Sequence, residues 1–307
     1  MTSTRTRGLM LAGVTAAISG VAIYVNANGV AAYGDATAYT TAKNTAAALV
    51  IALVFVMARR ARGSEAVRVS RPSRASQWWA LAVVAIFGGA VPFVLFFTGL
   101  AQTASTQAAF LHKTQVVWVA VLAVLLLKER LTWWHGAAIS LLILAQLGLA
   151  GDVRIAADMG TPLIAAATLM WAGEVALSKR LLRDMSPWTL SLTRMGGGSV
   201  ALLAWTALTG SLSSVVPSTM AQWGWIAVTG ILLAGYVLTW HQALARAQAV
   251  DVTAVLTLGA LVTAVLAGAF DGGPLIAQSP WLAMIAAGAL LVWLAPQLNL
   301  RGRRLAT

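Results

Sequence analysis

Apolar runs of membrane-spanning length recur along almost the whole chain, and they constrain its fold more than any other feature. An α-helix needs about twenty consecutive, mostly apolar residues to cross the hydrocarbon core of a bilayer. These runs are continuous rather than alternating in polarity, which excludes a transmembrane β-barrel. The sequence therefore predicts an all-α membrane protein with ten transmembrane helices. The expected spans lie near 8–31, 37–58, 78–100, 104–127, 134–151, 160–182, 187–210, 221–245, 252–270 and 279–297.

The composition agrees with this interpretation. Of the 307 residues, 59% are hydrophobic and only 10% are charged, against roughly 25% charged residues in soluble domains. Too few polar residues remain to cover a water-facing surface, which excludes an ordinary soluble enzyme. The chain has no Cys, so a disulfide framework and a thiolate metal site are excluded. No metal or cofactor is expected. The first run lacks the features of a cleaved signal peptide.

The basic residues predict how the spans are oriented. A net charge of +12 could suit nucleic acid, but the basic residues lie between apolar runs instead of forming one basic face, so no nucleic-acid partner is expected. With ten spans, 17 of the 21 Lys and Arg residues fall on one side and only Arg154 on the other. The positive-inside rule then predicts a multi-pass protein of the cytoplasmic (inner) membrane with both termini in the cytoplasm. The Arg-rich loop 59–77 is expected to fix this topology, with a lipid-headgroup or regulatory site as the alternative.

The chain divides into two halves of five predicted spans each. An odd number of spans per half inserts the second half upside down, as in many secondary transporters. Asp35 precedes Lys43 by eight residues and Ser186 precedes Arg194 by the same spacing. Eight residues at 1.5 Å each place Lys43 and Arg194 about 12 Å deep from opposite faces. The expected parts are a first repeat at 1–151, a linker at 152–159, an inverted second repeat at 160–300 and a basic cytoplasmic tail at 301–307.

Residues 101–148 carry the most distinctive motif of the sequence. They open with AQTASTQAAFL, continue through an apolar run to LLLKERLT at 125–132, and end in a Gly-containing segment. This pattern resembles EamA-type members of the drug/metabolite transporter superfamily, and Glu129-Arg130-Leu131 matches its short basic–acidic turn. Val116 stands where the family often has Pro, and the second half has Pro274 in place of an acidic counterpart of Glu129. The resemblance implies ten helices, a central substrate cavity and alternating access.

Ionisable residues inside the predicted spans are candidates for function, because an unpartnered charge in a bilayer costs several kcal/mol. Lys113 lies about 15 Å into the fourth span, near the midplane. We expect Lys113, Lys43 and Arg194 to bind an anionic group of the substrate; for the last two, a structural pair that fixes helix packing is the alternative. His112 is also a candidate, but adjacent helix residues point about 100° apart, so only one of His112 and Lys113 should face the cavity. Thr106 shares the helix face of Lys113.

Glu174 is the candidate for proton coupling, because a carboxylate in an apolar setting can exchange protons near neutral pH. Ala172-Gly173-Glu174-Val175 is similar to the glutamate helix of small multidrug members of the same superfamily. The alternative is a structural pair with Arg194, or with the cytoplasmic Lys179 and Arg180. His241 is a second proton-coupling candidate, with a simple hydrogen-bonding role as the alternative. Asp251 is expected to cap the ninth span.

Aromatic and amide side chains deep within the spans complete the expected substrate site. Trp residues near span ends fit the interfacial belt. Trp118, Trp171 and Trp240 lie deeper, and Tyr24 and Asn26 are further candidates in the first span. Core packing is the alternative for the aromatic residues.

These features predict a secondary active transporter and not an enzyme, because the chain has no P-loop, HExxH or GxSxG motif. We expect proton-coupled export of a small, amino-acid-like metabolite by alternating access. Import of an anionic sugar acid or nucleoside-like solute is one alternative. A lipid-handling or structural membrane subunit is another, and a homodimer stays open. The expected partners are the small-molecule substrate, the lipid bilayer and protons.

Overall fold

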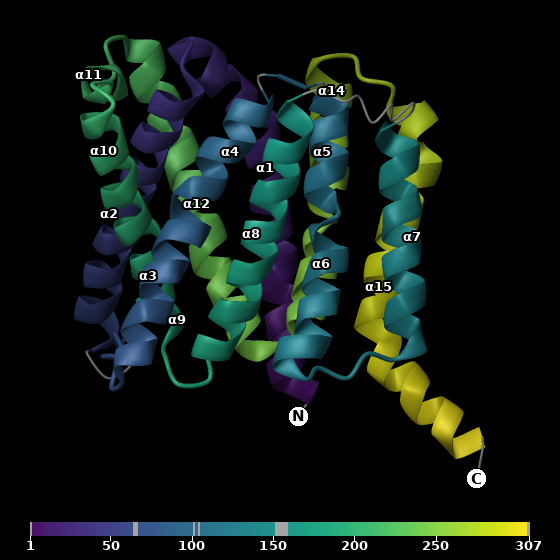
Figure 1. Ribbon diagram of the computed structural model, residues 1–307. Helices are drawn as coiled ribbons and strands as arrows, with labels where there is room; N and C mark the ends of the chain where they lie inside the picture. The colour runs from purple at the N-terminus through teal and green to yellow at the C-terminus, as the bar shows by residue number, and fades with distance from the viewer. Residues whose placement is uncertain (1, 64–66, 101, 104, 151–158, 306–307) are drawn as a thin grey trace.

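The computed structural model describes residues 2–63, 67–100, 102–103, 105–150 and 159–305, and every element in these ranges is helical. Figure 1 shows the helices as a bundle with both chain ends at the same end of it. The helices of the first half are α1 (Thr2–Tyr33), α2 (Ala36–Arg62), α3 (Ala75–Gly89), α4 (Val91–Leu100), α5 (Ser105–Lys113), α6 (Gln115–Leu122), the π-helix η1 (Ala123–Leu127) and α7 (Trp133–Ala150). Those of the second half are α8 (Gly160–Leu181), α9 (Pro187–Leu192), the π-helix η2 (Thr193–Gly197), α10 (Gly198–Leu208), α11 (Leu212–Val215), α12 (Met220–Arg246), α13 (Ala249–Leu256), α14 (Gly259–Phe270) and α15 (Leu275–Leu305).

Within the described residues, eight helical segments are long and apolar enough to cross a membrane. Each corresponds to one of the ten predicted spans. The predicted fifth span is the shorter apolar helix α7, and the predicted seventh is the interrupted series α9–η2–α10. The expected linker lies almost wholly outside the described residues, and the expected tail begins as a continuation of α15.

A break divides the predicted third span into α3 and α4, and its cause is Pro92. A proline has no N–H to donate to the carbonyl four residues earlier, so the carbonyl oxygen of Gly88 is free for other donors. It accepts hydrogen bonds from Trp171 Nε1 at 3.3 Å and Arg194 Nε at 3.2 Å. The Gly89 carbonyl accepts one from Asn44 Nδ2 at 3.1 Å. The break therefore ties α3 to three other helices.

Helix α3 packs against η2 at backbone distance. A Cβ atom at Gly89 would meet the carbonyl oxygen of Arg194 and lie 3.0 Å from the Cα atom of Gly198. Glycine is required at such a contact because any side chain would separate the two backbones. The contact holds the π-helical turn that carries Arg194 against the first half of the chain.

The chain ends lie at what we call the basic end of the bundle, where α2, α8 and α12 end at Arg62, Leu181 and Arg246 (Figure 1). Here a polar network joins the two halves. Arg5 Nε donates to Asp251 Oδ2 at 3.0 Å, and Arg5 Nη2 forms an ion pair with the same oxygen at 2.9 Å. Arg5 also donates to the carbonyls of Val292 and Trp293. His135 Nε2 lies 3.1 Å from Asp251 Oδ1. Asp251 thereby connects α1, α7 and α13.

The N-terminus of α13 is capped differently from the sequence-based expectation. The N-cap residue is Gln248, whose side chain makes no capping bond, and Asp251 lies inside the first turn. The Glu129 carboxylate instead accepts from the backbone N–H groups of Ala249 at 2.9 Å and Val250 at 3.4 Å. Burial raises the pKa of Glu129, and these two bonds oppose the rise. The Glu129-Arg130-Leu131 turn thus holds the first half to the second.

Candidate substrate cavity

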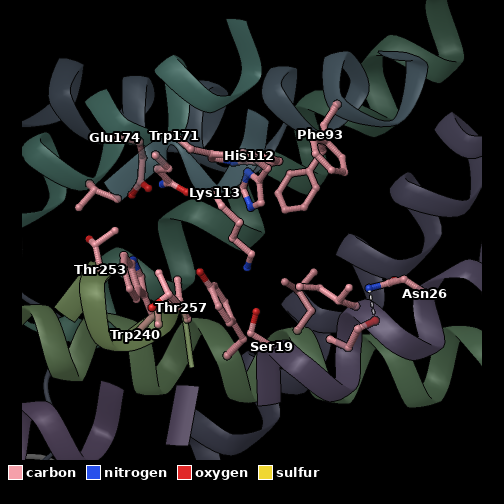
Figure 2. Close-up of a pocket in the computed structure, with 18 of the residues that line it drawn as sticks. Ser19, Asn26, Phe93, His112, Lys113, Trp171, Glu174, Trp240, Thr253 and Thr257 are labelled. Atoms are coloured by element: carbon pink, nitrogen blue, oxygen red, sulfur yellow. Dashed lines mark hydrogen bonds between the residues drawn. The ribbon is translucent and has the colours of Figure 1, made fainter. Parts of the chain in front are cut away.

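A cavity of about 190 Å³ lies between the two halves, near the middle of the bundle. Its lining alternates between aromatic rings and polar or ionisable groups. Figure 2 shows Glu174 and Trp240 toward one end, Asn26 at the other, and Lys113 pointing into the space between them. The lining side chains that carry a polar atom or a ring are Ser19, Asn26, Lys43, Phe93, Phe96, Phe97, His112, Lys113, Gln115, Trp171, Glu174, Arg194, Thr229, Tyr236, Trp240, Thr253 and Thr257.

Lys113 and His112 both line the cavity, although only one of them was expected to do so. The reason is the length of the lysine side chain, whose flexible four-carbon stem reaches the cavity from the end of α5. The His112 ring packs edge-on against Phe96 and Trp171, at centroid distances of 5.3 and 5.0 Å. Within the described part of the chain, Lys113 Nζ has no hydrogen bond or ion pair.

Lys43 enters the cavity from α2 inside a cage of rings. Its ammonium lies 4.9 Å from the ring centroid of Phe97, 5.0 Å from that of Tyr39 and 5.7 Å from that of Phe93. It also donates to Asn26 Oδ1 at 3.2 Å. Aromatic faces attract cations, so the three rings hold the ammonium in place. Among the described residues, no carboxylate lies within 4.0 Å of the Lys43 ammonium.

Glu174 lies opposite Arg194, which is the structural pair given above as the alternative to proton coupling. Arg194 Nη1 is 3.7 Å from Glu174 Oε2, and both groups are buried. Ser178 Oγ donates to Glu174 Oε1 at 2.5 Å. Oε2 itself accepts no hydrogen bond in the described structure. The negative charge is balanced, while one carboxylate oxygen is buried without a hydrogen-bond donor among the described residues.

His241 lies behind Glu174, outside the cavity lining. Its Nε2 atom is 4.0 Å from Glu174 Oε1, and its Nδ1 atom is 2.9 Å from Ser191 Oγ. The ring is completely buried. Lys179, the other expected neighbour of Glu174, instead donates to the carbonyls of Leu244 and Ala247 at the end of α12, each at 2.6 Å.

The aromatic candidates divide into two groups. Trp171 and Trp240 line the cavity, as does the amide of Asn26. Trp240 stacks on Tyr236 with an interplanar angle of 11°, and its Nε1 atom has no hydrogen-bond partner in the described structure. These side chains supply flat apolar walls with a free N–H donor.

Two expected substrate-binding residues are not at the cavity, and a third cannot be placed. Trp118 is 42% exposed, because α6 turns Val116 and Val119 inward and Trp118 outward. The Tyr24 hydroxyl donates to Asp271 Oδ1 at 3.0 Å on the outer surface. The side chain of Thr106 lies outside the described structure.

Sequence reasoning missed several cavity residues on the helices of the second half, among them Tyr236, Thr253 and Thr257. Tyr236 lies four residues before Trp240, which was expected at the site, and Thr253 lies four residues before Thr257. Side chains at this spacing share one helix face. The spacing was a signal that could have identified all three.

Comparison with known proteins assigns the family. The EamA-like transporter family matches twice, at residues 6–150 and 158–295. No curated protein matches the chain. A solved structure described only as "Crystal structure of protein" aligns with a TM-score of 0.71 and 18% sequence identity over 98% of this chain and 99% of that one. At this identity the likeness shows a shared fold. Because the two family matches span most of the sequence, the chain belongs to the EamA-like transporter family of multi-pass membrane proteins.

Proposed function

We propose that this protein is a secondary active transporter that exports a small amino-acid-like metabolite in exchange for protons. The observation that carries the proposal is a cavity between the two halves that holds Lys113 and Glu174. Among the described residues, Lys113 has no partner and Glu174 Oε2 has no hydrogen-bond donor. A zwitterion presents the two complementary groups. Its carboxylate would bind Lys113 and its ammonium would approach Glu174, while Trp171 and Trp240 would cover its apolar part.

In this proposal the chain forms ten spans in two inverted five-helix repeats. Helix α7 and the series α9–η2–α10 are the two further spans beside the eight longer segments. The two family matches and the position of both termini at the same end of the bundle support this arrangement. The excess of basic residues at that end supports a cytoplasmic location for it, in a protein of the cytoplasmic (inner) membrane.

Proton coupling is assigned to Glu174, with Arg194 and His241 as positioning residues. A substrate ammonium and a proton compete for the same carboxylate, so release of the solute favours protonation of Glu174. Arg194 loses its counter-ion when Glu174 is protonated. The Arg194 bond to Gly88 then links the protonation state of Glu174 to the break between α3 and α4.

A second candidate from the same class is import of an anionic sugar acid or nucleoside-like solute, which the two cavity lysines favour. A lipid-handling or structural subunit receives less support, because Lys113 faces a cavity between the halves and is not paired off within the described structure.

The test uses purified protein in liposomes that contain a pH-sensitive dye. Pools of amino acids, sugar acids or nucleosides are added under an imposed pH gradient. We expect proton flux with the amino-acid pool, and loss of that flux in both Glu174→Gln and Lys113→Gln. Unchanged rate and pH dependence in both variants would contradict the proposal.

A further inference from the structure

The ionisable side chains that line the cavity do not balance one another. Glu174 and Arg194 form an ion pair. Lys43 and Lys113 remain, and neither has a carboxylate within 4.0 Å among the described residues. The cavity therefore holds two cations for which the described residues provide no carboxylate counter-ion. Burying a cation away from water is unfavourable unless a partner is supplied, and a bound solute can be that partner.

The two lysines present their charges at different places. Lys43 Nζ lies at the Asn26 end, where it donates to the Asn26 amide oxygen and is surrounded by three rings. Lys113 points into the middle of the cavity, between Asn26 and Glu174 (Figure 2). Along the cavity the order is therefore an acceptor at Glu174, a cation at Lys113 and a second cation at Lys43.

Resting on the proposed function, we infer that the solute is a compact amino dicarboxylate. Its α-ammonium approaches Glu174 Oε2, its α-carboxylate binds Lys113, and its side-chain carboxylate binds Lys43. This order places the ammonium and the α-carboxylate next to each other, as they are in an α-amino acid. The volume of about 190 Å³ is below the roughly 300–1,000 Å³ of pockets for drug-sized ligands, which suits a solute of this size.

The specificity would come from Lys43. A neutral amino acid leaves the Lys43 ammonium unpaired, whereas a second carboxylate forms a charge-assisted hydrogen bond with it. Organic cations are disfavoured because both lysines repel them. Lys43 is therefore the residue that separates acidic from neutral amino-acid-like solutes.

The experiment measures binding to the full-length protein in detergent by isothermal titration calorimetry. The probes are L-glutamate, L-glutamine and glutarate. Glutamine has the shape of glutamate without the second charge, and glutarate lacks the ammonium. We expect glutamate to bind the wild type at least about tenfold more tightly than either of the other two, since one charge-assisted contact is worth about that factor.

Two variants assign the charges. Lys43→Met should reduce glutamate affinity to the level of glutamine, and Lys113→Met should weaken the binding of both amino acids. Arg180→Met is the matched control, because Arg180 is an exposed basic residue of α8 and does not line the cavity. Gel filtration checks that each variant is folded, and the wild-type comparison of glutamate with glutamine needs no variant.

The outcomes separate this inference from the proposed function. If glutamine binds as tightly as glutamate, the second carboxylate is refuted, while transport of a neutral amino acid stands. If glutarate binds as tightly as glutamate, the assignment of the ammonium to Glu174 is refuted. If no probe binds and the amino-acid pool drives no flux in liposomes, both the inference and the proposed function fail.

Discussion

Replacing Asp251 by Asn should destabilise the fold strongly, although the residue lies outside the cavity. The carboxylate has an exposed fraction of 1%, forms a hydrogen-bonded ion pair with Arg5 and is hydrogen-bonded to His135. Removing one partner of a buried ion pair typically costs about 3–5 kcal/mol. The Arg5 side chain is 26% exposed and keeps the carbonyls of Val292 and Trp293 as acceptors. We therefore expect the lower end, about 3 kcal/mol, for Asp251→Asn.

A double-mutant cycle tests the reason for this loss. Arg5→Met leaves Asp251 without its main counter-ion, and the double variant removes both charges. The summed cost of the single variants should exceed the cost of the double variant by about 2 kcal/mol, within the range for residues in direct contact.

The assay is reversible unfolding in mixed detergent micelles, followed by tryptophan fluorescence. Asp184→Asn is the control, because Asp184 is an exposed acidic residue just after α8, and its replacement should leave the unfolding curve unchanged. A loss below about 0.5 kcal/mol for Asp251→Asn, or single-variant effects that add within about 0.5 kcal/mol, would show that the ion pair does not stabilise the fold.

Three further predictions follow from the same contacts. Gly89→Ala should sharply lower the yield of folded protein in gel filtration, since its Cβ would meet the Arg194 carbonyl, whereas Gly196→Ala has open space and should be tolerated; equal yields would contradict the contact. Burial raises the pKa of Glu129 in the folded protein, so the folded state binds the proton more tightly than the unfolded state does. This stabilises the fold below pH values of about 4.3, the ordinary pKa of glutamate, and the contribution is lost as pH rises through the higher pKa of the folded state. The melting temperature of the wild type should therefore fall relative to Glu129→Gln as pH increases through this range, and a rise would argue against it. Glu174→Gln should remove most of the pH dependence of solute flux in proteoliposomes, and a retained pH profile would assign coupling elsewhere.

The sequence was most informative about residues whose chemistry conflicts with a membrane. Lys43, Lys113, Glu174 and Arg194 are costly in a span, so each had to face a cavity or a partner, and the structure places all four at one cavity. The same argument could not tell binding from pairing. Arg194 lies opposite Glu174 because a π-helical turn presents it there, and a hydropathy pattern does not reveal that turn.

Side-chain direction was the least predictable property. Trp118 and Trp171 both lie within apolar stretches of the sequence, yet Trp118 faces outward and Trp171 lines the cavity. The partners of Asp251 are 246 and 116 residues away, at Arg5 and His135. A capping role could be inferred from local sequence, whereas a contact between α13, α1 and α7 depends on how the two halves dock.

The proposed function requires the cavity to bind an amino-acid-like solute and to carry it across the membrane, and counterflow detects both steps. Liposomes loaded with an unlabelled amino-acid pool are diluted into trace radiolabelled amino acids, with wild type and Lys113→Gln compared at equal protein content. We predict transient accumulation of label by the wild type and little or none by the variant. Equal accumulation by both, or none by the wild type, would contradict the assignment of this cavity as the substrate site.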